Sequence, residues 1–148
     1  MLTSRPHISL PVANLDSAIR FYSTVFGTNP TKQRDDYANF RLEEPPLHLA
    51  LVPDAKVVPN PRIEQHFGIE LFDHNQLRAW QERVVTAGLV VRTEESVTCC
   101  YAVADKFWLQ DPDGNEWEFW VRTDEADSMH SVPSGSEESA CCTPPCCS

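Results

Sequence analysis

Two hydrophobic patterns follow each other at the beginning of the chain. Residues 7–12 alternate between polar and hydrophobic side chains, which predicts a half-buried strand with Ile8, Leu10 and Val12 on its hydrophobic face. Asn14 is a typical helix N-cap, and hydrophobic residues then recur at helical spacing up to Gly27, which predicts a helix between them. Two or three strands come next, and residues 37–42 and 47–52 have the clearest strand pattern.

The same succession begins again after a linker at residues 53–62, which contains three prolines. Residues 66–72 have the alternation of a strand, and a helix with hydrophobic residues at helical spacing follows and ends at Gly88. Hydrophobic stretches then predict three more strands, at roughly residues 89–93, 103–110 and 116–122.

The two halves of the sequence look like copies of one βαβββ unit. From His7 to Gly27 the chain advances 20 residues, and from His66 to Gly88 it advances 22. Because internal repetition is a strong sign of fold, we predict an α+β fold of two modules, at about residues 5–53 and 64–122.

We predict that residues 1–123 form one domain, because a segment of this length can bury a normal hydrophobic core. Residues 124–148 are rich in Ser, Glu, Pro and Cys and hold few large hydrophobic side chains. This composition predicts a disordered, acidic, cysteine-rich tail.

The net charge of −10 excludes several classes of partner. The last 25 residues hold five acidic side chains and no Lys or Arg, and no Lys/Arg cluster occurs in the rest of the chain. We therefore expect neither a nucleic-acid nor an anionic-membrane partner. The chain lacks a run of about 20 hydrophobic residues and an N-terminal signal segment, so we expect a cytoplasmic protein with reduced thiols.

The six cysteines occur as three adjacent pairs, and the pair Cys99–Cys100 is the most informative. Neighbouring Cα atoms lie about 3.8 Å apart, whereas relaxed disulfides prefer roughly 4.4–6.8 Å. Two such thiols are poor disulfide partners, yet together they can bind one soft metal ion or one trivalent arsenic atom. The alternative is that both are small buried hydrophobic residues.

A second set of residues has the ligand types of a metal site. His7 and His66 each begin a strand on the face opposite to its hydrophobic side chains, and Glu118 lies on the corresponding face of the last strand. Two histidines and one carboxylate are the ligands of non-haem Fe(II) oxygenases. Hydrogen-bonded histidines and a solvated glutamate are the alternative for each residue taken singly.

Several motifs together resemble the vicinal oxygen chelate superfamily, which includes glyoxalases, bleomycin resistance proteins and extradiol dioxygenases. The similarity covers about residues 5–122 and implies a cup-shaped mixed sheet around a metal. The motifs are His7-Ile-Ser-Leu-Pro-Val, Phe21-Tyr22…Phe26-Gly27, His66-Phe-Gly-Ile-Glu and Asp111-Pro-Asp-Gly-Asn…Glu118.

Within that superfamily, four further segments resemble the organoarsenical carbon–arsenic lyases, some relatives of which are labelled cadmium-induced proteins. These segments are Tyr37-Ala-Asn-Phe, Pro45-Pro-Leu, Cys99-Cys100-Tyr101 and Asp105-Lys106…Trp108.

The resemblance implies an Fe(II)- and O₂-dependent enzyme that cleaves trivalent organoarsenicals, such as methylarsenite or trivalent aromatic arsenicals, to arsenite. It places the metal ligands on His7, His66 and Glu118, and the catalytic, arsenic-binding thiols on Cys99 and Cys100.

Residues 92–106 connect two predicted strands, and we interpret them as a mobile substrate-loading loop. Tyr101 and Lys106 either contact substrate or are ordinary loop surface. The aromatic residues near the end of the chain either line the pocket or belong to the core; they are Phe107, Trp108 and Trp120.

His48 is a fourth metal ligand or a pocket-lining residue, because it points inward near the counterpart of Glu118. His74, at a helix start, and His130, in the tail, are not expected to be ligands.

Two rival functions remain at this point. A glyoxalase-type isomerase or lyase with Ni²⁺ or Zn²⁺ fits if His48 completes a four-ligand set, and a non-catalytic protein that binds As(III) or Cd²⁺ fits the thiols. The tail cysteines either collect a soft metal or have no enzymatic consequence; they are Cys141, Cys142, Cys146 and Cys147. The superfamily builds its cup within one chain or between two, so a homodimer is an alternative.

Overall fold

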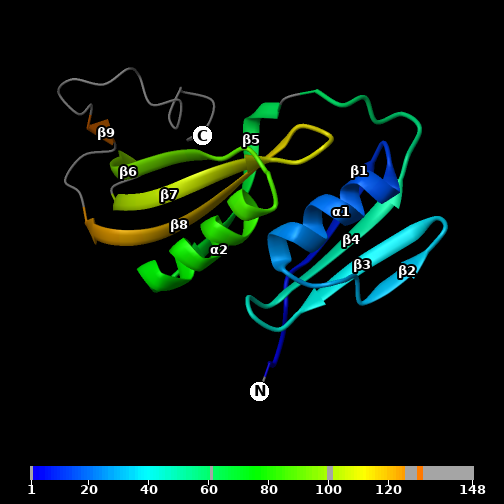
Figure 1. The fold of residues 1–148 in the computed structure, drawn as a ribbon, viewed down its shortest axis with the longest axis horizontal. Helices are drawn as coiled ribbons and strands as arrows, with labels where there is room; N and C mark the ends of the chain where they lie inside the picture. The colour runs from blue at the N-terminus through cyan, green and yellow to red at the C-terminus, as the bar shows by residue number, and fades with distance from the viewer. Residues whose placement is uncertain (1, 61, 100–101, 126–129, 132–148) are drawn as a thin grey trace. The chain divides into compact units, whose positions relative to one another are not determined.

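The computed structural model describes residues 2–60, 62–99, 102–125 and 130–131. The chain divides into two compact units (Figure 1). The first spans Met1–Pro61 together with Asp111–Gly114, and the second spans Arg62–Gln110 and the residues from Asn115 onward. The boundary at Pro61 lies in the predicted proline-rich linker.

The first unit is one βαβββ module. Its elements, in chain order, are β1 (His7–Val12), α1 (Leu15–Phe26), β2 (Lys32–Arg34), β3 (Tyr37–Leu42) and β4 (Leu47–Pro53). The four strands form a sheet in the order β1-β4-β3-β2, in which β1 runs parallel to β4 and the other pairs are antiparallel.

The second unit repeats this arrangement with longer strands. Its elements are β5 (Arg62–Leu71), α2 (His74–Thr86), β6 (Arg92–Cys99), β7 (Ala102–Gln110), β8 (Asn115–Glu125) and β9 (His130–Ser131). The sheet order is β5-β8-β7-β6-β9, and β5 runs parallel to β8 as β1 does to β4. The predicted duplication and the α+β fold class are confirmed.

The ends of α1 are those that the sequence predicts. The Asn14 side chain accepts a hydrogen bond from the Ser17 N–H at 2.8 Å, as an N-cap does. Gly27 has the left-handed conformation, with φ of 65°, which glycine adopts without a steric cost. Between these caps, α1 buries one hydrophobic stripe consisting of Ala18, Phe21, Tyr22, Val25 and Phe26.

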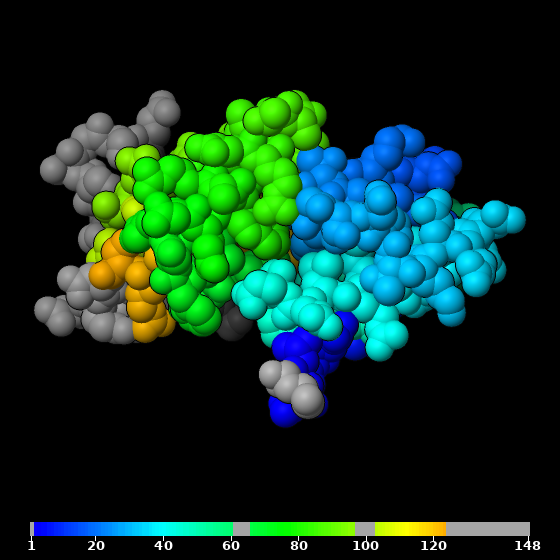
Figure 2. Space-filling model, turned by 60° about the horizontal axis from the view of Figure 1, so that its bottom comes forward, coloured from blue at the N-terminus to red at the C-terminus, as the bar shows by residue number. Residues whose placement is uncertain are grey.

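In the second unit, α2 packs on one face of the sheet, and it belongs to the green part of the surface in Figure 2. Its N-cap is Asp73, whose side chain accepts from the Asn75 N–H at 2.7 Å. Beneath the helix, the rings of Phe107 and Phe119 stack with centroids 4.9 Å apart, and Trp80 lies 5.3 Å from Phe119. The opposite face of this sheet carries the alternate residues of these strands, which include Lys106, Trp108, Glu118 and Trp120. Neither of the two described helices has the length and hydrophobicity of a membrane span.

The Asp111–Gly114 turn belongs to the first unit although it connects β7 to β8. The buried Tyr22 hydroxyl donates to Asp111 Oδ2 at 2.5 Å, and Asp111 Oδ1 accepts from the Asp113 N–H at 3.0 Å. Asp113 Oδ1 in turn accepts from the Ala13 N–H at 3.1 Å. In this chain the Asp-Pro-Asp-Gly segment is thus anchored by buried hydrogen bonds.

The interpretation of residues 92–106 as a loop is wrong. Residues 92–99 form β6 and residues 102–106 belong to β7, and the two strands pair from Arg92↔Trp108 to Cys99↔Ala102. The predicted strand at 89–93 overlaps β6 only at its last two residues. The reason is a bulge between Glu94 and Val97, where Ser96 has a φ of 52°, because an extra residue interrupts the alternation by which a strand is recognised.

Two other boundaries differ from the prediction. β5 begins at Arg62, four residues before the predicted strand, and β8 continues to Glu125. His130–Ser131 forms the short strand β9 on β6, within the segment predicted to be a disordered tail. Residues 132–148, with the four tail cysteines, lie outside the described residues.

We predict that Asp111→Asn lowers the free energy of unfolding by about 1–3 kcal/mol, because an amide nitrogen replaces one of two buried acceptor oxygens. Urea denaturation followed by tryptophan fluorescence measures the change. Asp36→Asn, in the exposed turn after β2, is the matched control and should change stability little. If the two substitutions changed the free energy of unfolding equally, the buried hydrogen bonds of Asp111 would not contribute to stability as predicted.

Candidate functional site

The parallel pair β5–β8 brings His66 and Glu118 together. His66, Gly68 and Glu118 lie on the face of the sheet opposite to α2, because the alternate residues Ile69 and Phe119 are buried in the core. His66 Nε2 is 3.5 Å from Glu118 Oε1. The side chains are 32% and 14% exposed, respectively. The structure therefore brings together two of the three predicted metal ligands.

Gly68 makes room for Glu118, and sequence reasoning missed it. The two residues are register partners on β5 and β8, and a Cβ at position 68 would lie 2.8 Å from Glu118 Cγ and 3.2 Å from its carbonyl oxygen. Such contacts are too short, so the carboxylate stem lies where any other side chain would begin. A glycine inside a predicted strand is the signal that could have indicated this close approach.

Lys106 binds the other oxygen of Glu118. Its Nζ lies 3.4 Å from Glu118 Oε2, and its side chain is 5% exposed. Of the two interpretations of Lys106, ordinary loop surface is wrong, because the residue lies in β7 and its stem is buried. The two carboxylate oxygens thus face an imidazole on one side and an ammonium on the other.

Glu118 is held in its ionised form by these neighbours. Burial raises the pKa of its carboxyl group, but the hydrogen bond from His66 and the positive charge of Lys106 outweigh burial, and the pKa is lower than usual. An anionic carboxylate beside an imidazole is a donor set suited to a divalent metal.

Trp108 lies beside both His66 and Glu118. It is the register partner of Glu118, and its ring centroid is 5.1 Å from that of His66 in an edge-to-face arrangement. The cations of Arg92 and Lys106 lie 5.2 and 5.6 Å from the ring centroid. Trp108 is therefore part of the wall of this site.

His7 and His48 form a second pair, in the first unit. They are register partners on β1 and β4, and their rings stack with centroids 4.3 Å apart. Burial, together with the charges of His7, Arg41 and Arg5, lowers the pKa of His48. Its Nε2 atom is buried and has no hydrogen-bond partner among the described parts of the chain. A neutral imidazole with an unused nitrogen is the form that binds metals.

The strand register defines where His48 lies relative to the counterpart of Glu118. With His7 and His66 as equivalent positions, His48 corresponds to Glu116, and Ala50 corresponds to Glu118. His48 is on the expected face but two residues away from the counterpart of Glu118, because side chains on one face of a strand recur every second residue.

The donor chemistry of both pairs fits a first-row metal such as Fe(II). Among the residues that the structure describes, no three His, Cys, Asp or Glu side chains meet in one metal-binding group. The donors occur as one pair in each unit, His7–His48 and His66–Glu118. A site that joins His7 to the second pair is therefore a proposal.

The predicted thiols are only partly within the described residues. The backbone of Cys99 ends β6, where it pairs with Ala102 of β7 and His130 of β9. Cys100 and Tyr101 lie outside the described residues. The arsenic-binding role of the two thiols and the substrate contact of Tyr101 remain predictions.

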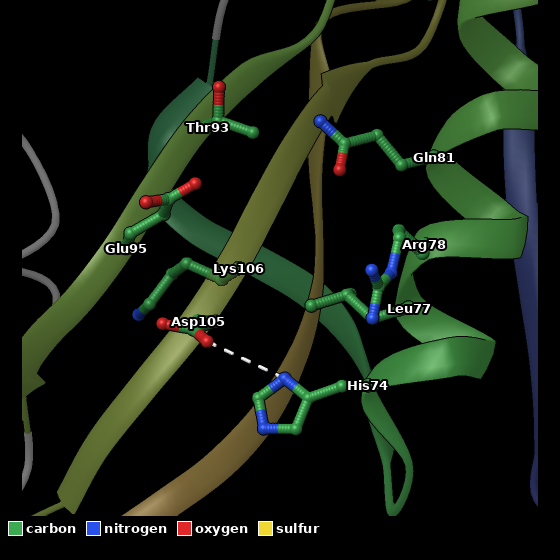
Figure 3. A pocket seen from close by; sticks show the side chains of 8 residues that line it. All are labelled: His74, Leu77, Arg78, Gln81, Thr93, Glu95, Asp105 and Lys106. Carbon is green, nitrogen blue, oxygen red and sulfur yellow. Dashed lines mark ion pairs between the residues drawn. The ribbon is translucent and has the colours of Figure 1, made fainter.

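A separate polar pocket lies between α2 and the strands β6 and β7 (Figure 3). It has a volume of about 360 Å³, and neither His66 nor Glu118 lines it. His74 Nδ1 is 3.5 Å from Asp105 Oδ2, while Asp105 Oδ1 accepts from the Ser96 N–H at 2.7 Å. Asp105 thereby ties the bulge of β6 to the start of α2. His74, which was not expected to bind a metal, has a carboxylate partner here.

Comparison with known proteins places this geometry in a family. The Glyoxalase/Bleomycin resistance protein/Dioxygenase superfamily matches residues 4–119. A protein of Thermomonospora curvata named "Trivalent organoarsenical cleaving enzyme" is 40% identical over 141 residues, which cover 95% of this chain and 89% of that protein. The "Cadmium-induced protein CadI" of Mycobacterium bovis is 36% identical and is matched over 94% of this chain and 93% of its own length.

Solved structures agree on the fold. A glyoxalase/bleomycin resistance protein/dioxygenase from Alicyclobacillus acidocaldarius superimposes with a TM-score of 0.61 at 22% identity, covering 82% of this chain and 93% of that chain. The duplicated βαβββ modules, the match to the superfamily over residues 4–119 and the two relatives that align over nearly the whole chain all support one assignment. The chain belongs to the glyoxalase/bleomycin resistance protein/dioxygenase superfamily, in the group that contains the trivalent organoarsenical cleaving enzymes and the cadmium-induced proteins.

Proposed function

We propose that this protein is an enzyme that cleaves the carbon–arsenic bond of trivalent organoarsenicals, using Fe(II) and O₂, and releases arsenite. The observation that carries the proposal is the His66–Glu118 pair, with its carboxylate ionised, on the open face of the second sheet. The similarity over 95% of the chain to a protein named for this activity supports the choice of substrate.

The proposed metal ligands are His7, His66 and Glu118. Two imidazoles and one carboxylate leave coordination positions open for other molecules, as in the 2-His-1-carboxylate oxygenases. When bound there, Fe(II) would supply the O₂ chemistry. His66 and Glu118 already lie 3.5 Å apart, so little rearrangement of this pair is needed to bind one ion.

Cys99 and Cys100 would capture the arsenic. A species R–As(OH)₂ exchanges both hydroxyl groups for two thiolate sulfurs and releases two molecules of water, which leaves the organic group R as the only free arm. Holding the substrate in this way makes cleavage of the carbon–arsenic bond effectively intramolecular. Such positioning lowers an activation barrier by up to about 7–11 kcal/mol in ideal cases. In the structure Cys99 pairs with Ala102, six residues along β7 from Trp108, which is about 20 Å of strand. Capture at Cys99 therefore requires this end of β6 to move toward the His66–Glu118 pair before the arsenic is close to the metal.

The overall reaction balances for methylarsenite. CH₃As(OH)₂ and one O₂ give As(OH)₃ and formaldehyde: arsenic stays trivalent, and the methyl carbon gives four electrons to O₂. Lys106 holds Glu118 through an ion pair at 3.4 Å, so its ammonium would keep the carboxylate ionised and in place for a metal.

A glyoxalase-type enzyme with Ni²⁺ or Zn²⁺ is the second candidate. The buried, unpartnered Nε2 of His48 favours it, because a fourth protein ligand would complete the set. Only the dioxygenase consumes O₂, so the first experiment below separates the two.

We predict that the Fe(II)-loaded protein converts methylarsenite to arsenite in air but not under nitrogen, with one O₂ consumed per arsenite released. Arsenic speciation by chromatography, together with an oxygen electrode, measures both quantities. Arsenite release at the same rate without O₂ would contradict a dioxygenase. Stoichiometric As(III) or Cd²⁺ binding without any product would indicate a sequestration protein instead.

Replacement of Glu118 by Ala should abolish Fe(II) binding and activity together. Loss of even an outer-shell partner weakens metal sites about 10–100-fold, so loss of a ligand should exceed that range. Anaerobic Fe(II) titration measures the affinity. The control is Glu116→Ala, on the same face of β8 and hydrogen-bonded to Gln110 rather than to His66. An iron-loaded, active Glu118→Ala protein would rule out this ligand.

Each of the single changes Cys99→Ser and Cys100→Ser should lose most carbon–arsenic cleavage while Fe(II) binding stays unchanged, because one remaining sulfur cannot hold the arsenic at two points. The double variant Cys141→Ser with Cys142→Ser controls for general loss of thiols and should keep its activity. Wild-type rates in either single variant would show that two-thiol capture is wrong.

A further inference from the structure

A buried hydrogen-bond donor beside the His66–Glu118 pair has no acceptor among the residues that the structure describes. The Nε1 atom of Trp108 is buried without a hydrogen-bond partner in the structure, and the residue as a whole is 5% exposed. Buried tryptophans normally pair this N–H group, and leaving such a donor unpaired costs about 1–3 kcal/mol. The other buried tryptophan, Trp117, does not have this defect. Of the two buried tryptophans, the one with an unpaired N–H group therefore lies at the candidate site. The other buried side-chain polar atoms without a partner among the described residues are Asn39 Oδ1, His48 Nε2 and Glu94 Oε2.

The residues around Trp108 restrict which atom could accept a hydrogen bond from its indole N–H. Indole N–H is a donor only and cannot itself bind a metal. Glu118, its register partner, already uses one oxygen toward His66 and the other toward Lys106. Glu94, on the adjacent strand β6, also has a buried oxygen without a partner, but no hydrogen bond joins it to the indole N–H among the described residues. An acceptor atom that arrives with a ligand would satisfy this N–H group.

The chemistry of the site selects an oxygen atom. Arg92 and Lys106 place two positive charges within 5.6 Å of the indole centroid, which favours an electron-rich acceptor over another cation. If both arsenic hydroxyl groups have been exchanged for sulfur, the bound substrate has no hydroxyl oxygen left to accept. The acceptor is then the oxygen ligand in the open position of the metal.

We infer that Trp108 is a catalytic residue whose indole N–H donates a hydrogen bond to the oxygen-type ligand bound at the metal beside His66 and Glu118. This inference rests on the proposed metal site. It assigns to the wall of that site a specific donor, fixed in place by the edge-to-face contact with His66 and by the two cations.

The test uses nitric oxide as the probe for the open position. Wild-type, Trp108→Phe and Trp120→Phe proteins are loaded with Fe(II) under anaerobic conditions, and nitric oxide is titrated and followed by absorbance and electron paramagnetic resonance. Phenylalanine keeps a ring against His66 but lacks the N–H group. Trp120, on the same face of the sheet and paired with Lys106, is the control for loss of an indole.

The expected result is a nitric oxide affinity about 5–30-fold weaker in Trp108→Phe, the change that one to two kcal/mol produces, together with a shift of the N–O stretching frequency. The Fe(II) affinity of Trp108→Phe and both properties of Trp120→Phe should match the wild type. Unchanged nitric oxide affinity and frequency in Trp108→Phe would overturn the inference. Loss of Fe(II) itself would also overturn it, because Trp108 would then only support His66.

Failure of the proposed function has a different signature. A wild-type protein that binds Fe(II) and nitric oxide but releases no arsenite from methylarsenite in air would disprove the substrate assignment. The comparison between Trp108→Phe and wild type would still decide the role of the indole, because it measures ligand binding and not turnover.

Discussion

The parallel pairing of β5 with β8 is the constraint on which the candidate site depends. This pairing places Gly68 opposite Glu118, and the missing side chain of glycine leaves the space through which the carboxylate reaches His66. The core face of the same two strands is filled by hydrophobic residues packed under α2. A shift of register by one residue would turn Glu118 into the core, so the hydrophobic face also fixes the polar one.

The ion pair between Lys106 and Glu118 explains how both charged side chains can be largely buried on this face of the sheet. Glu118 and Lys106 are largely withdrawn from water, and each would be costly alone. Together with His66 they form a compact group in which the carboxylate is ionised. Trp108 closes one side of this group and leaves its own N–H unpaired. Such clusters of perturbed, imperfectly satisfied groups are more common at functional sites than in structural cores.

The duplicated modules have diverged in their chemistry while keeping their topology. Each pairs its first strand in parallel with its last long strand, and the histidines His7 and His66 lie on these first strands on the face opposite to the core. The first module offers a second imidazole, His48, whereas the second offers the carboxylate of Glu118, two residues further along the strand than the equivalent of His48. One scaffold thereby supplies both nitrogen and oxygen donors, which is consistent with a metal-binding superfamily.

The sequence alone determined the two βαβββ modules, the caps of α1 and the face on which His7, His66 and Glu118 lie, because periodicity and capping are local properties. Only the tertiary structure showed that residues 92–99 form a strand, since the bulge at Ser96 hides the alternation and only pairing with β7 restores it. Likewise, the burial of Lys106, the clearance at Gly68 and the unpaired Trp108 N–H each depend on a neighbouring strand. Contacts between residues distant in the chain decided these features, and no local pattern encodes such contacts.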